Sequence, residues 1–393
     1  MSEYATKSYG RNEEVAAIYH HFNAGRDVAM PGPRRLGKTF VLDRLVEAAG
    51  PHGWVAVKVE VGGCSDTRAF FRTLCSRIGG SRSGGRTAIS WIRQRLGQIL
   101  EPRSDSSGEW YQPLISLDHE AYFERLIKAL NEDRERRWAL LIDELPIFLK
   151  AMHDQGSQGV DAARNFMNLS SHLRAEFPRV RWMITGSIGL EPLARAGNYI
   201  GVLAKYETFD LQPLSEVQAK EFVKDIAEAG RLLHRKAISD TEAEALVNAV
   251  GWRAAYYLEA LAKKLSGEPC DDAVQAQQLV EDAVRRLLEP GESTTFGVWE
   301  EHLRKHYRDT ERRVAFAALA ALAPNAQGLS LDALLPAVRQ ANVTRAELRE
   351  ALTRLHVEGF IAISDWDGDN PTAAFLSPLL RRWWQRFPPQ ALA

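Results

Sequence analysis

The sequence Gly32-Pro33-Arg34-Arg35-Leu36-Gly37-Lys38-Thr39 has the spacing of a phosphate-binding loop. In such a loop, glycines let the backbone curl so that its N–H groups point at phosphates, while a lysine reaches their outer oxygens. Residues 27–30, just before the loop, have the pattern of a short buried strand, and residues 40–47 after it have helical periodicity. Because the motif requires this context, we expect Lys38 and the loop to hold the phosphates of a nucleotide, and Thr39 to hold Mg²⁺.

Length and composition are typical of a soluble protein with several domains. A chain of 393 residues is long enough for two or three domains. The 50 Lys and Arg against 51 Asp and Glu give a net charge of -1, so any attraction to nucleic acid or membrane has to be local. The three cysteines are scattered, and the longest strongly apolar run, 314–323, is about half of a bilayer span. We therefore expect a cytoplasmic protein that has no membrane partner.

Strand and helix patterns alternate from the N-terminus to about residue 213. Beyond the strand and helix that flank the loop, strands are predicted at 54–61, 138–144, 180–184 and 205–211, and helices at 13–22, 68–78, 119–130, 161–177 and 190–196. Asp66 or Thr67 can cap the helix at 68–78. This alternation predicts an α/β fold with a five-stranded parallel sheet and helices on both faces.

A segment of different composition, 79–113, interrupts this alternation. It contains a possible helix at 88–100, and between residues 77 and 104 there are six arginines and one acid. One interpretation is a solvated insertion. The other is a contact surface for nucleic acid or for an acidic partner.

Two carboxylates, Asp143 and Glu144, end the apolar strand that starts at residue 138. Buried carboxylates are costly unless they meet a metal ion or water. We expect Asp143 to coordinate Mg²⁺ through water and Glu144 to polarise the water that attacks the terminal phosphate; the alternative is that the pair caps the next helix. Thr185 and Ser187 follow another buried strand, where a hydroxyl could sense the terminal phosphate or could merely cap a helix.

The rest of the chain is predicted to form two smaller domains. Ser215 and Gln218 make a capping box, and the predicted helices at 216–228, 240–250, 252–265 and 272–288 make a helical domain over 214–292. Residues 293–393 have predicted helices at 312–322, 331–340 and 345–358, strands at 360–364 and 373–376, and a helix at 378–387. Three helices followed by a two-stranded hairpin describe a winged helix-turn-helix.

With these residues in view, the chain resembles AAA-plus-related, STAND-type P-loop ATPases, most closely the archaeal-type ATPase family. The resemblance covers nearly the whole chain and rests on Gly10-Arg11 with Glu14, the loop at 32–39, residues 142–144, residues 185–187, and the stretches 209–214 and 375–381. It implies an ATPase core over 1–213, a helical lid and a winged-helix domain, with ATP or ADP and Mg²⁺ as cofactors. The site that it implies comprises Gly10 and Arg11 beside the base, the loop residues Gly32, Pro33, Arg34, Arg35, Leu36, Gly37, Lys38 and Thr39, then Phe40, and Arg253 in the lid.

The sequence departs from this family at the lid, where Gly251-Trp252-Arg253 replaces a Gly-x-Pro. Arg253 either brings a positive charge to the phosphates or faces solvent. Arg195 lies where related ATPases offer an arginine finger to a neighbouring subunit, or it is a surface arginine. Arg34 and Arg35 either steady the loop or contact another domain.

Two functions are consistent with these features. The first is an ATP-binding switch with slow hydrolysis, in which the lid and the winged helix move between ADP and ATP states, with self-association in the ATP state or a protein partner at the winged helix. The second is an ATP-regulated DNA-binding protein that uses the arginine-rich insertion and the basic last helix. Three acids in the wing, Asp365, Asp367 and Asp369, would repel phosphate backbones, so we favour the first function.

Overall fold

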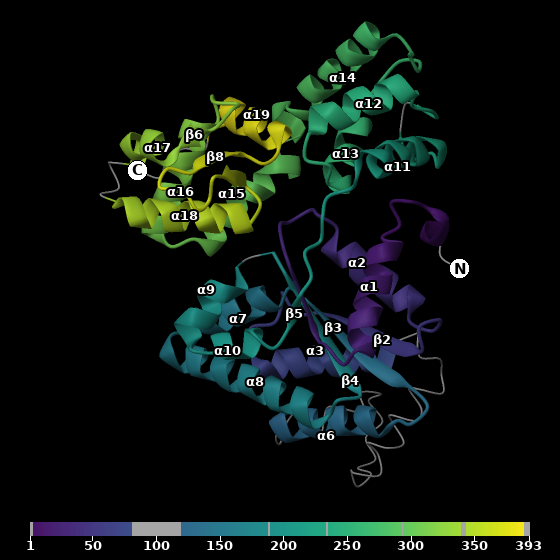
Figure 1. The fold of residues 1–393 in the computed structure, drawn as a ribbon, viewed down its shortest axis with the longest axis vertical. Coiled ribbons are helices and arrows are strands. Elements are labelled where there is room, and N and C mark those ends of the chain that lie inside the picture. Colours follow the sequence, from purple (N-terminus) through teal and green to yellow (C-terminus); the bar gives the residue numbers. More distant parts are fainter. Residues whose placement is uncertain are drawn as a thin grey trace. The chain divides into compact units, whose positions relative to one another are not determined.

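The computed structural model describes residues 3–80, 119–187, 189–232, 235–292, 294–338 and 343–388 (Figure 1). It divides into two compact units, one of Met1–Gly32 with Lys38–Leu211 and one of Pro33–Gly37 with Gln212–Ala393. Most of the predicted insertion, including its possible helix at 88–100, lies outside the described residues.

The described part of the first unit contains the predicted five-stranded parallel sheet. Its strands lie in the order β2-β3-β4-β1-β5, and each neighbouring pair is parallel. Strands β3 and β4 are buried almost throughout, which explains their continuous apolar sequences. The bounds are β1 (Val28–Pro31), β2 (Trp54–Glu60), β3 (Arg137–Asp143), β4 (Val180–Gly186) and β5 (Glu207–Thr208). The predicted α/β class is thus confirmed, although β5 is shorter than the predicted 205–211, because the N–H groups of Lys205 and Tyr206 bind the carbonyls of Val202 and Leu203 in a turn after α10 (Ile200–Leu203).

Helices pack on this sheet, most of them at predicted positions. They are α1 (Asn12–Asn23), α2 (Lys38–Ala48), α3 (Thr67–Gly80), α6 (His119–Glu132), α7 (Leu145–His153), α8 (Ser157–Glu176), α9 (Leu190–Gly197) and α10 (Ile200–Leu203), after a 3-10 helix, η1 (Glu3–Thr6). Asp66 caps α3 by accepting a hydrogen bond from the N–H of Ala69 at 2.8 Å. Helices α7 and α10 were not predicted: α7 is only nine residues long and has a proline at its second position, and α10 has only four residues.

Aromatic side chains fill the core between the sheet and helices α3, α6, α7 and α8. Phe70 lies at the centre of this cluster, with its ring 4.8 Å from that of Phe166 and 5.4 Å from that of Phe148. Phe123 extends the cluster to Trp182 of β4, at 5.7 Å. These contacts stabilise the sheet, and the edge of this sheet carries the polar residues described below.

A buried charged cluster lies at the start of β1. Asp27 accepts hydrogen bonds from Nε of Arg174 at 2.6 Å and from the main-chain N–H of Trp182 at 2.8 Å, and Arg181 lies 3.7 Å away. The guanidinium of Arg174 also lies 3.7 Å from the centre of the Tyr206 ring. The cluster therefore ties β1 to α8 and β4 at the end of the strand opposite the phosphate loop.

The second unit is mostly helical. Its elements are α11 (Glu216–Glu228), α12 (Asp240–Val250), α13 (Ala255–Ala262), α14 (Ala273–Leu287), η2 (Pro290–Glu292), α15 (Thr294–His306), α16 (Asp309–Leu322), β6 (Leu329–Ser330), α17 (Leu331–Val338), α18 (Arg345–Val357), β7 (Ile361–Ser364), β8 (Thr372–Phe375) and α19 (Pro378–Arg386). The Ser215 capping box with Gln218 is present as predicted. The predicted lid and winged-helix domain both fall within this unit, and their separation near residue 292 stays a prediction.

Three details of the second unit differ from the sequence prediction. Helix α15 was not predicted, and the short strand β6 joins the expected hairpin in an antiparallel sheet of order β6-β8-β7. The helix predicted at 252–265 starts later, because Arg253 is bound to Leu214. The Arg253 carbonyl accepts from the Leu214 N–H at 3.0 Å, and Arg253 Nε donates to the Leu214 carbonyl at 2.8 Å. These bonds keep the residues before α13 out of the helix.

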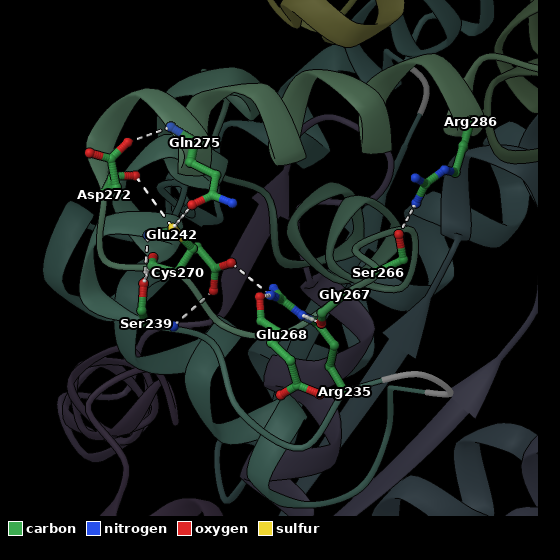
Figure 2. Close-up of polar contacts among 10 residues, drawn as sticks. All are labelled: Arg235, Ser239, Glu242, Ser266, Gly267, Glu268, Cys270, Asp272, Gln275 and Arg286. Carbon is green, nitrogen blue, oxygen red and sulfur yellow. Dashed lines mark hydrogen bonds and ion pairs between the residues drawn. The ribbon is translucent and has the colours of Figure 1, made fainter.

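A buried ion pair stabilises the helical part of this unit (Figure 2). Arg235 lies 2.7 Å from Glu242 of α12, and both side chains are almost completely buried. Arg235 also donates to the carbonyl of Gly267 at 2.7 Å, and the hydroxyl of Ser239 donates to the carbonyl of Cys270 at 2.5 Å. The loop between α13 and α14 is thus tied to the start of α12.

A second buried polar cluster joins α15 to the end of α18. Glu358 accepts hydrogen bonds from the hydroxyl of Tyr307 at 2.9 Å and from Nε of Arg354 at 3.1 Å, and it lies 2.7 Å from Nε2 of His302. Burial lowers the pKa of His302, an effect that the hydrogen bond to Glu358 opposes. Burial alone would raise the pKa of Glu358, but the bonds from His302 and Arg354 outweigh it and keep that pKa below its ordinary value. His302 is therefore neutral at pH 7 and donates its Nε2–H to an ionised Glu358.

This arrangement predicts that the second unit loses stability in mild acid. As the pH falls below about 6.5, His302 takes up a proton in the unfolded chain but not in the folded one, so the free energy of unfolding falls with pH. The lowered pKa of Glu358 acts in the same direction at lower pH. Thermal unfolding measured at pH 7.5 and pH 5.5 checks this, and His302→Gln should show a smaller difference. His172→Gln, which alters a histidine whose side chain is 70% exposed, should behave as the wild type.

Across the residues that the structure describes, every helix is too short or too polar to span a bilayer.

Candidate functional site

The phosphate-loop sequence joins β1 to α2, as its motif requires. Its backbone turns sharply, with φ of 145° at Gly32, 68° at Arg35 and 103° at Gly37. Lys38, the first residue of α2, donates from Nζ to the carbonyl of Gly32 at 2.7 Å. This bond spans the loop, and the loop leads into the N-terminus of an 11-residue helix, where free N–H groups and the helix dipole favour an anion.

Three oxygen-bearing side chains meet at the carboxyl edge of the sheet, beside the start of α2. Asp143, at the end of β3, accepts from the hydroxyl of Thr39 at 3.0 Å and from the hydroxyl of Thr185 at 2.5 Å. The strand order explains this meeting, because β4 lies between β3 and β1. A carboxylate and a hydroxyl that converge in this way are the hard oxygen donors that Mg²⁺ prefers, so the residues present fit this ion.

Glu144 follows directly but makes different contacts. It lies at the N-cap position of α7 with a left-handed backbone, φ 59°, and its side chain makes no capping bond. Its Oε2 instead accepts from the N–H of Ser187 at 3.1 Å and from the Ser187 hydroxyl at 2.9 Å. The Glu144 side chain therefore does not cap helix α7. Gly62, just after β2, leaves room for this arrangement, because a Cβ there would lie 3.3 Å from the Glu144 Cβ.

The N-terminal segment packs against the same helix. The ring of Tyr4 meets the ring of Phe40 edge to face at 5.1 Å, and a Cβ on Gly10 would lie 2.0 Å from the Tyr4 carbonyl oxygen. Arg44 of α2 donates from Nε to the Gly10 carbonyl at 3.1 Å, and Arg11 binds Glu14 at 2.6 Å. The structure thus brings Gly10, Arg11 and Phe40 together beside the start of α2.

Tyr4 and Arg44 were missed by the sequence analysis. Arg44 is 4% exposed, but it follows Asp43, whose side chain is 54% exposed, so the local sequence gave no signal that this arginine is buried. Tyr4 gave no signal, because a tyrosine near a chain end is not unusual.

The remaining arginines of the predicted site make contacts within their own units. Residues Pro33–Gly37 group with the second unit, where the guanidinium of Arg35 lies 4.2 Å from the centre of the Tyr256 ring. Arg253 binds Leu214, as described above. The Arg195 side chain is 69% exposed and binds Glu191 one turn earlier, at 2.5 Å. A role for Arg253 at the phosphates, or for Arg195 across a subunit interface, stays a prediction.

Comparison with solved structures identifies the fold. A Walker-type ATPase of Pyrococcus abyssi matches with a TM-score of 0.63 at 15% identity, over 96% of this chain and 97% of that one. The chain has the same fold as this Walker-type ATPase. The Aeropyrum pernix ORC2 protein, solved with ADPNP and ADP, matches with a TM-score of 0.49 at 13% identity, over 97% of this chain and 95% of that one. The Thermotoga maritima RuvB Holliday junction branch migration motor matches with a TM-score of 0.39 at 13% identity, over 93% and 91%. No protein-family model and no curated protein matches the chain.

Proposed function

We propose that this protein binds ATP with Mg²⁺ at the carboxyl edge of the first unit's sheet and hydrolyses it slowly, as a switch of the STAND type. The observation that carries the proposal is the meeting of Thr39, Asp143 and Thr185 beside Lys38, at the start of the helix that follows the phosphate loop. The Walker-type ATPase fold supports it.

Each residue has a role in this proposal. Lys38 and the loop N–H groups hold the phosphates, and Thr39 with Asp143 holds Mg²⁺, which when bound offsets the charge of the phosphates. Glu144 takes a proton from the attacking water. Thr185, whose hydroxyl donates to Asp143, couples the end of β4 to the state of the metal site.

Lys38→Ala is expected to weaken ATP binding by roughly a hundredfold, because charge-assisted contacts to phosphate are lost from the mouth of the loop. Binding of a fluorescent ATP analogue measures this directly. Lys58→Ala is the matched control, since it removes a lysine of β2 that pairs with Asp43. If Lys38→Ala bound ATP as tightly as Lys58→Ala, the phosphates would have to lie elsewhere.

The switch itself is tested by the molar mass of the protein in solution with ADP and with a non-hydrolysable ATP analogue and Mg²⁺. A rise with the analogue would support self-association in the ATP state. An unchanged mass would favour a switch internal to one chain that acts on a separate partner.

We propose a protein partner, and not DNA, for the C-terminal part of the second unit. Three of the arginines that would contact DNA are engaged within the unit: Arg349 donates to the carbonyl of Trp366 at 2.6 Å, Arg381 donates to the carbonyl of Ala323 at 3.0 Å, and Arg382 pairs with Glu281 at 2.5 Å. Phosphate contacts provide most of the affinity of DNA-binding proteins, and each of these pairs would have to be given up. A gel shift at low salt that is lost when Arg349, Arg381 and Arg382 are changed together to alanine would contradict this assignment.

A further inference from the structure

Ser187 is committed to Glu144 in this structure. Its main-chain N–H and its hydroxyl both donate to one oxygen of Glu144, Oε2, and Ser187 is 3% exposed. A hydroxyl that reads the terminal phosphate needs to be available to it. The Ser187 hydroxyl instead donates its hydrogen bond to Glu144, the carboxylate that the proposed function assigns as the base.

The contacts leave the two oxygens of Glu144 in different situations. Oε2 is fixed by two donors from the segment after β4, whereas Oε1 accepts no hydrogen bond from any residue that the structure describes. The backbone of Glu144 has φ 59°, which is unusual for a residue with a side chain. A side chain at such a turn needs an anchor if it is to point in one direction, and Ser187 supplies that anchor.

We propose that Ser187 is the positioning residue of Glu144 and not a reader of the terminal phosphate. This inference rests on the proposed function. With Oε2 anchored, Oε1 of Glu144 takes a proton from the water. The oxygen of that water forms the new bond to the terminal phosphorus. The bond from that phosphorus to the bridging oxygen of ADP breaks, so the products are ADP and phosphate.

The test separates turnover from binding. Ser187→Ala should lower kcat about tenfold, because it removes one hydrogen bond to a charged group, while the affinity for a non-hydrolysable ATP analogue should stay within about twofold. Ser187→Thr keeps the hydroxyl and should restore most of kcat. Ser170→Ala is the matched control, since Ser170 is equally buried and its hydroxyl donates to the Phe166 carbonyl in α8, away from the site.

A double variant adds a second criterion. If Ser187 acts through Glu144, Ser187→Ala should have little further effect on kcat in a Glu144→Ala background. An independent loss in that background would overturn the inference.

Other outcomes also overturn it. A loss of analogue affinity with kcat unchanged at saturation would make Ser187 a reader of phosphate. A Ser187→Thr variant as slow as Ser187→Ala would show that the hydroxyl is not what matters. If the wild type hydrolyses ATP and Ser187→Ala hydrolyses it at the same rate, this inference alone is wrong. If the wild type does not hydrolyse ATP, the proposed function is wrong as well.

Discussion

Glu144→Gln is expected to slow ATP hydrolysis by roughly 10²- to 10⁴-fold and to leave ATP affinity nearly unchanged. The amide has the shape of the carboxylate and can still accept the bonds from Ser187 through its oxygen, but it cannot take a proton from water. Asp143, which is assigned to Mg²⁺, is untouched, so the binding site for the nucleotide persists.

Single-turnover hydrolysis and analogue binding, measured on the same preparation, check this prediction. Glu191→Gln is the control, because Glu191 is an exposed carboxylate of α9 that pairs with Arg195. Hydrolysis at the native rate by Glu144→Gln would show that another group activates the water.

Asp27→Ala is expected to lower the free energy of unfolding of the first unit by about 3–5 kcal/mol. The change leaves the buried guanidinium groups of Arg174 and Arg181 without their carboxylate, and the N–H of Trp182 without its acceptor. Uncompensated buried charge is among the most destabilising single changes in a protein.

Urea unfolding followed by tryptophan fluorescence measures this loss. Asp161→Ala is the comparison, since Asp161 is an exposed carboxylate that pairs with Arg164 on the surface of α8, and its loss should cost under about 1 kcal/mol. Because Asp27 lies at the far end of β1 from the loop, the folded fraction of Asp27→Ala should still bind ATP. If the two variants unfolded at the same urea concentration, the buried cluster would contribute little to stability.

Local patterns predicted the sheet and the edge that carries the site. The phosphate loop, the apolar strands and the acids at their ends are all visible in short stretches of sequence, and the carboxyl ends of parallel strands necessarily share one edge. For this reason the sequence predicts that Thr39, Asp143 and Thr185 belong to the same site.

The partner of each polar group was not predictable in the same way. Nothing in the local sequence indicates that Ser187 binds Glu144 or that Arg44 binds the Gly10 carbonyl, because these contacts depend on how segments distant in sequence pack. Helix α15 was missed although its buried face is regular, since its polar residues and Gly297 obscured the apolar stripe. Strand β6 is only two residues long and has no pattern of its own.

The order of the sheet has a consequence for synthesis on the ribosome. Strand β1 pairs with β4 and β5, whose residues Met183 and Glu207 lie opposite Val28, so the first strand to be translated is the last to gain its neighbours. The nascent chain therefore carries an apolar strand and an unsupported phosphate loop until most of the first unit has left the ribosome. A truncated product that ends before β4 would expose that strand and would be a substrate for chaperones and proteases. It would also lack Thr185, at the end of β4, and so part of the proposed nucleotide site.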